Sequence, residues 1–301
     1  MNILLAGGSG QLGQELLLRL TALGQVTSVD RAPGIAGSFE MDLSDLKQVE
    51  NLLHQLRPEI VINAAAYTAV DQAENEARTA FHLNAELPAC MARWCKRNDR
   101  FLLHYSTDYV FNGESDHPYL EDDAPGPLGV YGETKLAGEW ALGASHCRHI
   151  ILRTSWVYST HGNNFVLSML RLARQRSELS IVSDQSGCPT WARNLAAASI
   201  TVLQQQIDQA QDVSRQGIFH FCDGSEVTWY DFARLIFEQA AELNLLHEIP
   251  RLKSIRSTEY PQIARRPQYS VLDTALIRQT FGIEPPDLRT SLRSCLQELV
   301  V

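Results

Sequence analysis

The sequence predicts an α/β protein built on a doubly wound parallel sheet, with a second, smaller α/β lobe. Three observations predict this class. Apolar segments of strand length alternate with amphipathic helices in the first half, a glycine-rich segment joins the first strand to the first helix, and the alternation loosens after Ser155. Continuously apolar strands indicate a parallel sheet that helices cover on both faces.

The elements of the first half follow one another as strand and helix. In the second predicted helix, leucines and one valine recur at helical spacing, which is typical of an amphipathic helix. Another helix is expected to run unbroken from about Asp71 to Lys96. The predicted strands are 2–6, 25–30, 59–66, 100–107 and 149–155, and the other predicted helices are 11–23, 43–56 and one that starts near Val130.

The second half mixes short strands with helices and contains an irregular segment rich in proline and arginine at 257–274. We therefore predict a dinucleotide-binding domain at 1–155, a substrate-binding lobe at 156–301, and last elements of the sheet interleaved from about 190–222. Helices are expected near 163–174, 192–205, 230–243 and 287–299, and strands at 179–182 and 217–221.

Composition excludes several classes of function. A net charge of −9 over 301 residues argues against binding to nucleic acid or to an anionic membrane surface. No segment is apolar over the 18 or so residues of a membrane span, and the N-terminus lacks the basic start of a signal peptide. Six scattered cysteines without a C-x-x-C pair suggest reduced thiols in a cytoplasmic protein, and no metal-ligand cluster is predicted.

The glycine-rich segment "GGSGQLG" (residues 7–13) follows the first strand and opens the first helix. Glycines there allow a tight turn and let backbone N–H groups approach a pyrophosphate at a helix N-terminus. A plain strand–helix turn is the alternative, but the setting is that of the Rossmann fold. The predicted pyrophosphate contacts are Gly7, Gly10, Gln11, Leu12 and Gly13.

Residues at the ends of the next strands complete a predicted site for NADPH or NADH. Asp30 can accept from the ribose hydroxyls, which favours NAD, whereas Arg31 can neutralise the 2′-phosphate of NADP, so both cofactors stay open. Asp42 and Leu43 are expected at the adenine, although Asp42 or Ser44 can instead cap a helix. The path towards the nicotinamide is predicted from the small or polar residues Ala64, Ala66, Tyr67 and Thr68.

The segment "HYSTDYVF" ends a predicted strand, so Thr107 and Asp108 are expected at the ligand edge of the sheet. Tyr131 and Lys135 follow at i and i+4 of a helix, on one face. Reduction of a ketone by a nicotinamide needs a proton donor, and a nearby ammonium lowers the pKa of a tyrosine that serves as one. Tyr131 is the predicted proton donor. Lys135 is predicted to lower the pKa of Tyr131 and to bind the nicotinamide ribose, and Thr107 to orient the substrate oxygen.

Family-like segments run along nearly the whole chain: "MNILLAGGSGQLGQEL", "RPEIVINAAAYTAVDQAE", "HYSTDYVFNG", "VYGETKLAGE", "ILRTSWVY", "GNNFV", "DQSGCPT" and "RRPQYSVLDT". The sequence thus resembles the extended short-chain dehydrogenase/reductases and, within them, the dTDP-4-dehydrorhamnose reductase family. The resemblance implies reduction of a nucleotide-linked 4-keto sugar, with Thr107, Tyr131 and Lys135 catalytic. It also implies substrate contacts from Thr107, Asp108 and Trp156. Arg266 is a predicted clamp for the diphosphate, with a surface ion pair as the alternative.

The resemblance also implies Mg²⁺ between two subunits, held by carboxylates near the first helix and after the G-x-P-T turn. The sequence keeps Glu15 but has Arg193 and Asn194 after that turn, which argues against the metal. A homodimer is a further expectation. Two rival functions stay open: a nucleotide-sugar epimerase or dehydratase on the same scaffold, and a non-catalytic regulatory subunit of methionine adenosyltransferase.

Overall fold

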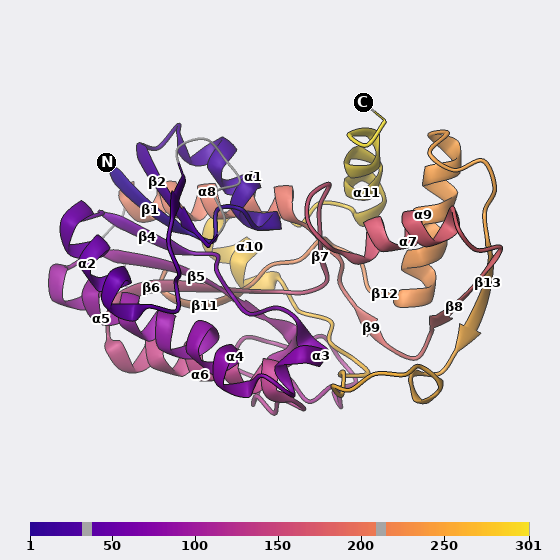
Figure 1. The fold of residues 1–301 in the computed structure, drawn as a ribbon, viewed down its shortest axis with the longest axis horizontal. Coiled ribbons are helices and arrows are strands. Elements are labelled where there is room, and N and C mark those ends of the chain that lie inside the picture. The colour runs from indigo at the N-terminus through magenta and orange to yellow at the C-terminus, as the bar shows by residue number, and fades with distance from the viewer. Residues whose placement is uncertain (32–37, 209–214, 301) are drawn as a thin grey trace.

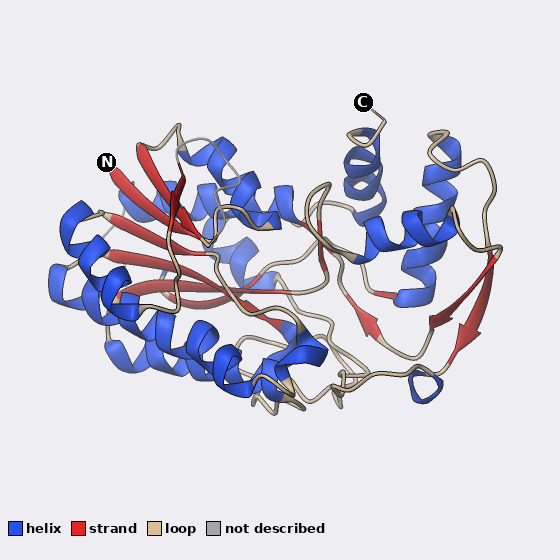
Figure 2. Cartoon of the chain, in the orientation of Figure 1, coloured by secondary structure: helices blue, strands red, loops and turns tan. Residues whose placement is uncertain are grey.

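The computed structural model describes residues 1–31, 38–208 and 215–300. In this part of the chain one parallel sheet of seven strands has the order β11-β6-β5-β4-β1-β2-β3. Figures 1 and 2 show it lying between two layers of helices. The strands are β1 Asn2–Ala6, β2 Gln25–Asp30, β3 Ser38–Glu40, β4 Ile60–Asn63, β5 Phe101–Thr107, β6 Arg148–Thr154 and β11 Gly217–His220. The doubly wound fold class is confirmed.

The two faces of the sheet bury alternate residues of each strand. On one face, Ile3 and Leu5 pack with three helices: α1 Gln11–Leu20, α8 Ala192–Asp208 and α10 Ala275–Phe281. On the other, Leu4 and Ala6 pack with α2 Leu46–Leu56, α5 Leu87–Asn98 and α6 Val130–Ser145. Successive side chains of a strand point to opposite faces, so burial on both faces requires the continuous apolar runs seen in the sequence.

The single helix predicted from Asp71 to Lys96 is wrong. The segment forms α3 Val70–Ala73, α4 Ala77–Phe81, one π-helical turn at His82–Glu86, and then α5. Pro88 has no N–H and cannot continue an α-helical ladder, but it fits the first turn of a new helix. The N–H of Leu87 instead bonds to the carbonyl of His82, five residues back.

The second core belongs to the lobe and lies apart from the sheet at the right of Figure 1. Tyr158, Trp191, Phe232, Phe237 and Leu292 are among its buried members. Its helices are α7 Phe165–Ala173, α9 Trp229–Glu242 and α11 Leu288–Gln297, and its strands pair as β7 Val157–Tyr158 with β10 Thr190–Trp191, β8 Glu178–Val182 with β13 Arg251–Ile255, and β9 Ser186–Gly187 with β12 Val227–Thr228. The strand β13 and the helix α10 are not among the predicted elements.

The chain returns from the lobe to the sheet. β11 lies beside β6 in parallel register, and α8 packs through Leu195, Val202 and Leu203 against the same core as α1. Both elements fall in or near the range predicted to be interleaved, of which residues 209–214 lie outside the described part. The domain boundary at residue 155 stays a prediction.

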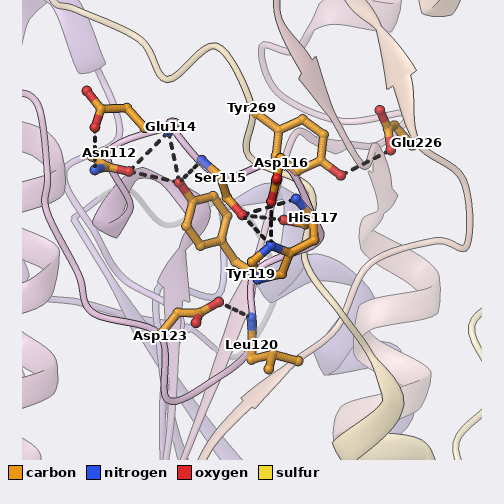
Figure 3. Close-up of polar contacts among 10 residues, drawn as sticks. All are labelled: Asn112, Glu114, Ser115, Asp116, His117, Tyr119, Leu120, Asp123, Glu226 and Tyr269. Carbon is orange, nitrogen blue, oxygen red and sulfur yellow. Dashed lines mark hydrogen bonds and ion pairs between the residues drawn. The ribbon is translucent and has the colours of Figure 1, made fainter.

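The segment between β5 and α6 is held by the hydroxyl of Tyr119, as Figure 3 shows. This oxygen accepts from the backbone N–H groups of Gly113, Glu114 and Ser115 at 3.0–3.2 Å and donates to Asn112 Oδ1 at 2.9 Å. The Tyr119 ring stacks on Phe111, 4.1 Å between centroids. This turn fixes the chain that separates Thr107 from Tyr131.

None of the helices in the described ranges is long and apolar enough to span a membrane. The six cysteines are unpaired and buried, which agrees with the absence of a C-x-x-C pair from the sequence.

Candidate functional site

The structure has two large cavities, one at the carboxyl ends of the sheet strands and one in the lobe. The first, here the glycine-loop cavity, has a volume of about 660 Å³ and is lined by the glycine loop, the ends of β2, β4 and β5, and α6. The second, the lobe cavity, also measures about 660 Å³ and is lined by α7, β8 and the segment 259–266. The ligand edge of a doubly wound sheet is the expected place for the first.

The glycine loop has the conformation that close backbone approach requires. Gly7 adopts a φ of +86°, in the left-handed region that favours glycine, and a Cβ there would meet Ala65 N at 2.5 Å. A Cβ on Gly13 would meet the Gly7 carbonyl oxygen at 2.0 Å. Gly7, Gly10, Gln11 and Leu12 line the glycine-loop cavity, whereas Gly13 lies behind it and lets α1 pack closely. This cradle fits a dinucleotide pyrophosphate.

The predicted adenosine end lines the same cavity through Asp30, Arg31, Asp42 and Leu43. Asp30 Oδ2 accepts from the backbone N–H of Ser9 at 3.0 Å and from its hydroxyl at 2.5 Å, which ties the end of β2 to the glycine loop. Asp42 accepts from Ser44 N at 2.9 Å, and this bond lowers the pKa of its carboxyl. The cap of α2 is Asp45, not Asp42 or Ser44, so Asp42 does not cap a helix and remains available to a ligand.

The path from the loop to the chemical end is lined by Ala64, Ala66, Tyr67 and Thr68. Asn84 in the π-helical turn fixes this stretch. Its side chain accepts from Tyr67 N at 2.8 Å and donates to the Tyr67 carbonyl at 3.1 Å and to Thr134 at 3.1 Å. Asn84 therefore links the predicted cofactor path to the helix that carries Tyr131.

Tyr131 and Lys135 both line the glycine-loop cavity from α6. The i, i+4 spacing places them on one face of the helix, as predicted. The Lys135 Nζ donates to the Tyr105 carbonyl oxygen at 2.6 Å, so it is held against β5. Ser106 and Thr154 also line this cavity, and Thr107 is buried directly beside Ser106.

Burial dominates the acid–base properties of this pair. It lowers the pKa of Lys135 to about 8, opposed by the Glu139 carboxylate, and the side chain still carries a proton for most of the time at pH 7. Burial also raises the pKa of Tyr131 to about 12, opposed by a hydrogen bond with Thr107. This direction is opposite to the predicted lowering, because burial disfavours the charged phenolate and is the largest cause of the shift in this pKa.

Asp108 lies beneath the reactive edge, only 2% exposed, and does not line either large cavity. Its Oδ1 accepts the hydroxyl of Thr107 at 3.0 Å. Burial raises the pKa of its carboxyl to about 6, opposed by hydrogen bonds with Ser270 and Thr107. The geometry therefore favours Asp108 as the group that orients Thr107, in place of the direct substrate contact that the resemblance implies.

Trp156 lies behind another aromatic ring. It adopts a φ of +46°, uncommon for a bulky residue, and stacks on Trp229 with centroids 3.4 Å apart and planes 6° apart. Trp229 and Phe165 line the lobe cavity, whereas Trp156 does not. The predicted apolar wall is thus presented by Trp229, a residue that sequence reasoning missed, with Trp156 supporting it.

Arg266 lines the lobe cavity near its junction with the domain. Its Nη2 lies 2.8 Å from Asp71 Oδ2, and its Nη1 donates to Gln262. Both sequence interpretations of Arg266, a diphosphate clamp and an ion pair, are therefore compatible with its position. Lys253 and Arg176 add positive charge to the same cavity.

The residues where the resemblance implies Mg²⁺ do not fit a cation. Glu15 is 1% exposed, and both its oxygens accept from Arg193, at 3.1 and 3.3 Å. Arg193 also pairs with Glu298, the residue that follows α11, at 2.7 Å from Nη2. A guanidinium thus stands between the two carboxylates, and among the described residues no group of three acidic, histidine or cysteine side chains gathers to hold a metal.

A buried ion pair under α6 is a further feature that the sequence did not reveal. Arg153 at the end of β6 and Glu139 in α6 form two bonds of 2.9 and 2.6 Å, and both are 3% exposed. Glu139 is one turn beyond Lys135. Charged residues in a strand and a helix fourteen positions apart carry no pattern that distinguishes them from surface groups, so only the packing reveals the pair.

Comparison with known proteins gives full-length matches. A family model described as the RmlD substrate binding domain matches residues 1–301. The dTDP-4-dehydrorhamnose reductase of Shigella flexneri is 42% identical over 301 residues, 99% of this chain and 98% of that protein. A dTDP-4-dehydrorhamnose reductase structure from Clostridium acetobutylicum has a TM-score of 0.88 at 33% identity, covering 100% of both chains. That from Bacillus anthracis, in complex with NADP, has a TM-score of 0.86 at 31% identity over 99% of each.

Proposed function

The chain belongs to the dTDP-4-dehydrorhamnose reductase family, and we propose that it reduces the 4-keto group of dTDP-4-dehydro-β-L-rhamnose to give dTDP-β-L-rhamnose. The observation that carries this proposal is that Tyr131 and Lys135 share one cavity with the glycine loop. A nicotinamide path that ends at a tyrosine and a lysine fits hydride and proton transfer to a carbonyl.

The chain's own residues supply the proton and orient the ketone. When bound, the dihydronicotinamide supplies the hydride and is left with a positive charge. Tyr131 donates its hydroxyl proton to the C4 oxygen, and the Thr107 hydroxyl, which donates to Asp108 in the structure, is proposed to turn and donate to that oxygen instead. The protonated Lys135 contributes positive charge to the cavity and a hydrogen bond to the nicotinamide ribose, which favours the Tyr131 phenolate. A proton from solvent then restores the phenol.

The nucleotide part of the substrate is proposed to lie in the lobe cavity. Trp229 and Phe165 offer aromatic surface for a base, and Arg266 and Lys253 offer positive charge for the diphosphate. Thr107 and Trp156 were predicted to contact the substrate, and Trp156 contributes here by supporting Trp229.

For the cofactor we propose a nicotinamide dinucleotide, with NADPH and NADH both to be tested. Arg31 lines the glycine-loop cavity beside Asp30, so a cation is available for a 2′-phosphate. The Asp30 carboxylate already accepts two bonds from Ser9, which leaves it less free to bind ribose hydroxyls. These contacts favour NADPH. No step of the proposed reaction uses Mg²⁺.

The decisive test is oxidation of NADPH or NADH, followed by absorbance, with the keto sugar present or omitted. Consumption of cofactor only with the keto sugar, together with formation of dTDP-rhamnose, is the expected result. A protein that retains NAD through purification, never consumes it and interconverts nucleotide sugars would instead be an epimerase or dehydratase. Capture of a methionine adenosyltransferase without any turnover would support a regulatory subunit.

A homodimer and a cytoplasmic location stay predictions. Measurement of the mass in solution tests the first, and cell fractionation tests the second.

A further inference from the structure

One side chain of the sheet domain holds a segment of the lobe through three bonds. Asp71, in the short helix α3 that follows β4, accepts from the backbone N–H groups of Ile263 at 3.2 Å and Ala264 at 3.0 Å through Oδ1. Its Oδ2 accepts from Arg266 Nη2 at 2.8 Å. The partners lie 192 to 195 positions further along the chain, so these bonds join the two halves directly.

The same segment reaches the proposed proton donor. Ala264 and Pro267 line a small cavity together with Tyr109 and Tyr131, and Val70, the neighbour of Asp71, completes this wall. The Tyr109 ring packs edge-on against Tyr131, with centroids 5.6 Å apart and planes 81° apart. A shift of the segment 262–267 would therefore change the surroundings of the phenol.

Two other residues of the segment, Gln262 and Arg266, form part of the wall of the lobe cavity. The Arg266 guanidinium is bound by Asp71 through Nη2 and by Gln262 through Nη1, and it also hydrogen-bonds with the side chain of Tyr109. Because the fork is planar, these bonds together set its orientation.

We propose that Asp71 is a positioning residue, which seats the segment 262–267 against Tyr131 and orients Arg266 towards the diphosphate of the substrate. The proposal rests on the proposed function, because the diphosphate belongs to that substrate. Asp71 lines neither the lobe cavity nor the glycine-loop cavity. Through its three contacts, the Asp71 carboxylate would set the distance between the bound diphosphate of the substrate and the hydroxyl of Tyr131.

The alternative is an ordinary surface ion pair. The Asp71 side chain is 41% exposed, and a pair of this exposure contributes little to stability. A surface pair predicts that its loss changes neither substrate affinity nor rate. A positioning residue predicts a selective loss of substrate affinity with the fold intact, so the two interpretations differ in what is measured.

The test compares Asp71→Asn and Asp71→Ala with the wild-type full chain. An asparagine can still accept the two backbone N–H groups but loses the charge that binds Arg266. We expect Asp71→Asn to raise KM for the keto sugar about tenfold, the value of one charge-assisted hydrogen bond, with kcat reduced less than threefold. In Asp71→Ala the segment loses all three bonds, so KM should rise further and kcat should fall about tenfold. KM for NADPH should stay unchanged in both.

Glu242→Gln is the matched control, because Glu242 forms an exposed ion pair with Arg293 at 2.6 Å and neither residue lines a cavity of the proposed site. It should leave every constant unchanged. The proposed contact of Arg266 with the diphosphate is tested with dTDP and thymidine as competitive inhibitors. Asp71→Asn should weaken inhibition by dTDP about tenfold and leave inhibition by thymidine unchanged, because thymidine lacks the diphosphate.

Two results would overturn the inference. A KM for the keto sugar that is unchanged would reduce Asp71 to a surface ion pair. A lower KM would show that Asp71 competes with the substrate for Arg266. Failure of the proposed function is seen separately, as a wild-type chain that does not reduce the keto sugar. In that case calorimetry with dTDP tests the positioning role of Asp71 without any turnover. Equal dTDP affinities in wild type and Asp71→Asn would contradict this role.

Discussion

The glycine-loop cavity and the lobe cavity have about the same volume but are built in different ways. Most walls of the first come from segments at or just after the carboxyl ends of sheet strands, and α6 adds Tyr131 and Lys135. The second takes them from α7, β8, α9, β13 and the irregular segment 257–266, which are far apart in the sequence. The parallel sheet gathers strand ends at one edge, whereas only the packing of the lobe gathers its wall.

The two cavities are proposed to serve different steps, the reaction in the first and binding of the nucleotide in the second. The residues proposed to transfer the proton and hold the cofactor belong to the sheet domain, and those proposed to hold the nucleotide belong to the lobe. Asp71 and Glu15 are among the sheet-domain groups whose contacts cross to the second half of the chain. Substitutions in the two regions should therefore affect different constants.

The largest effect is expected from Tyr131→Phe, at the chemical end of the glycine-loop cavity. Loss of the proton donor should lower kcat by roughly 1,000-fold, the usual contribution of general acid catalysis. Cofactor affinity should stay the same, because the ring remains in place. Steady-state kinetics and a fluorescence titration with NADPH measure the two quantities. Activity within fivefold of wild type would remove Tyr131 as the acid.

A smaller but still large effect should follow from Arg193→Ala, at the contact between the halves. Glu15 is almost fully buried and also pairs with Arg19 at 3.0 Å. Removing Arg193 therefore takes away one of its two cations and should lower the free energy of unfolding by about 2 kcal/mol. Arg97→Ala is the matched control, since Arg97 pairs with Glu50 at the surface and should cost about 0.5 kcal/mol.

Urea denaturation measures both variants. Addition of EDTA or Mg²⁺ should leave the wild-type midpoint unchanged, because the Arg193 guanidinium occupies the place between Glu15 and Glu298. A midpoint that rises with Mg²⁺ would contradict the absence of a metal site.

Asp108→Asn should change how stability depends on pH. Burial raises the pKa of the Asp108 carboxyl to about 6 in the folded chain, above its ordinary value of 3.8. The contribution of the protonated Asp108 carboxyl to the free energy of unfolding is therefore fully present below about pH 4. It is lost as the pH rises through 6 and the carboxyl ionises. The variant should therefore gain stability relative to wild type over this interval, by on the order of 2 kcal/mol. Urea midpoints at pH 4, 5, 6 and 7 test the sign, and parallel curves would contradict it.

Gly13→Ala should mainly affect cofactor affinity. The added Cβ would lie 2.0 Å from the Gly7 carbonyl oxygen, so the glycine loop must shift from the conformation that cradles the pyrophosphate. We expect the dissociation constant of NADPH to rise at least tenfold, about 1.4 kcal/mol. Gly143→Ala in α6 is the control, because a Cβ there meets nothing within 4 Å. It should leave binding unchanged and add up to about 1 kcal/mol of stability. Equal cofactor affinity in both variants would contradict the packing role of Gly13.

The limits of prediction are seen at particular residues. The end of β2 at Asp30 and the pairing of Tyr131 with Lys135 on one helical face follow from apolar runs and helical spacing. The division of the helix predicted from Asp71 to Lys96 into shorter pieces does not follow from helical spacing, although Pro88 marks the start of α5. Trp229 was missed since an aromatic residue in an amphipathic helix is usually core, and its partner Trp156 is adjacent only after folding.

The sequence by itself determined the parallel sheet, the glycine loop and the order of groups along its edge, because these depend on local periodicity and on the handed connection of strands. The tertiary structure alone decided which charges meet. Glu15 faces Arg193, Glu139 faces Arg153, and Asp71 faces the segment that carries Arg266. Hydrogen bonds and ion pairs act over about 3 Å, and only the folded chain brings residues so distant in sequence within that range.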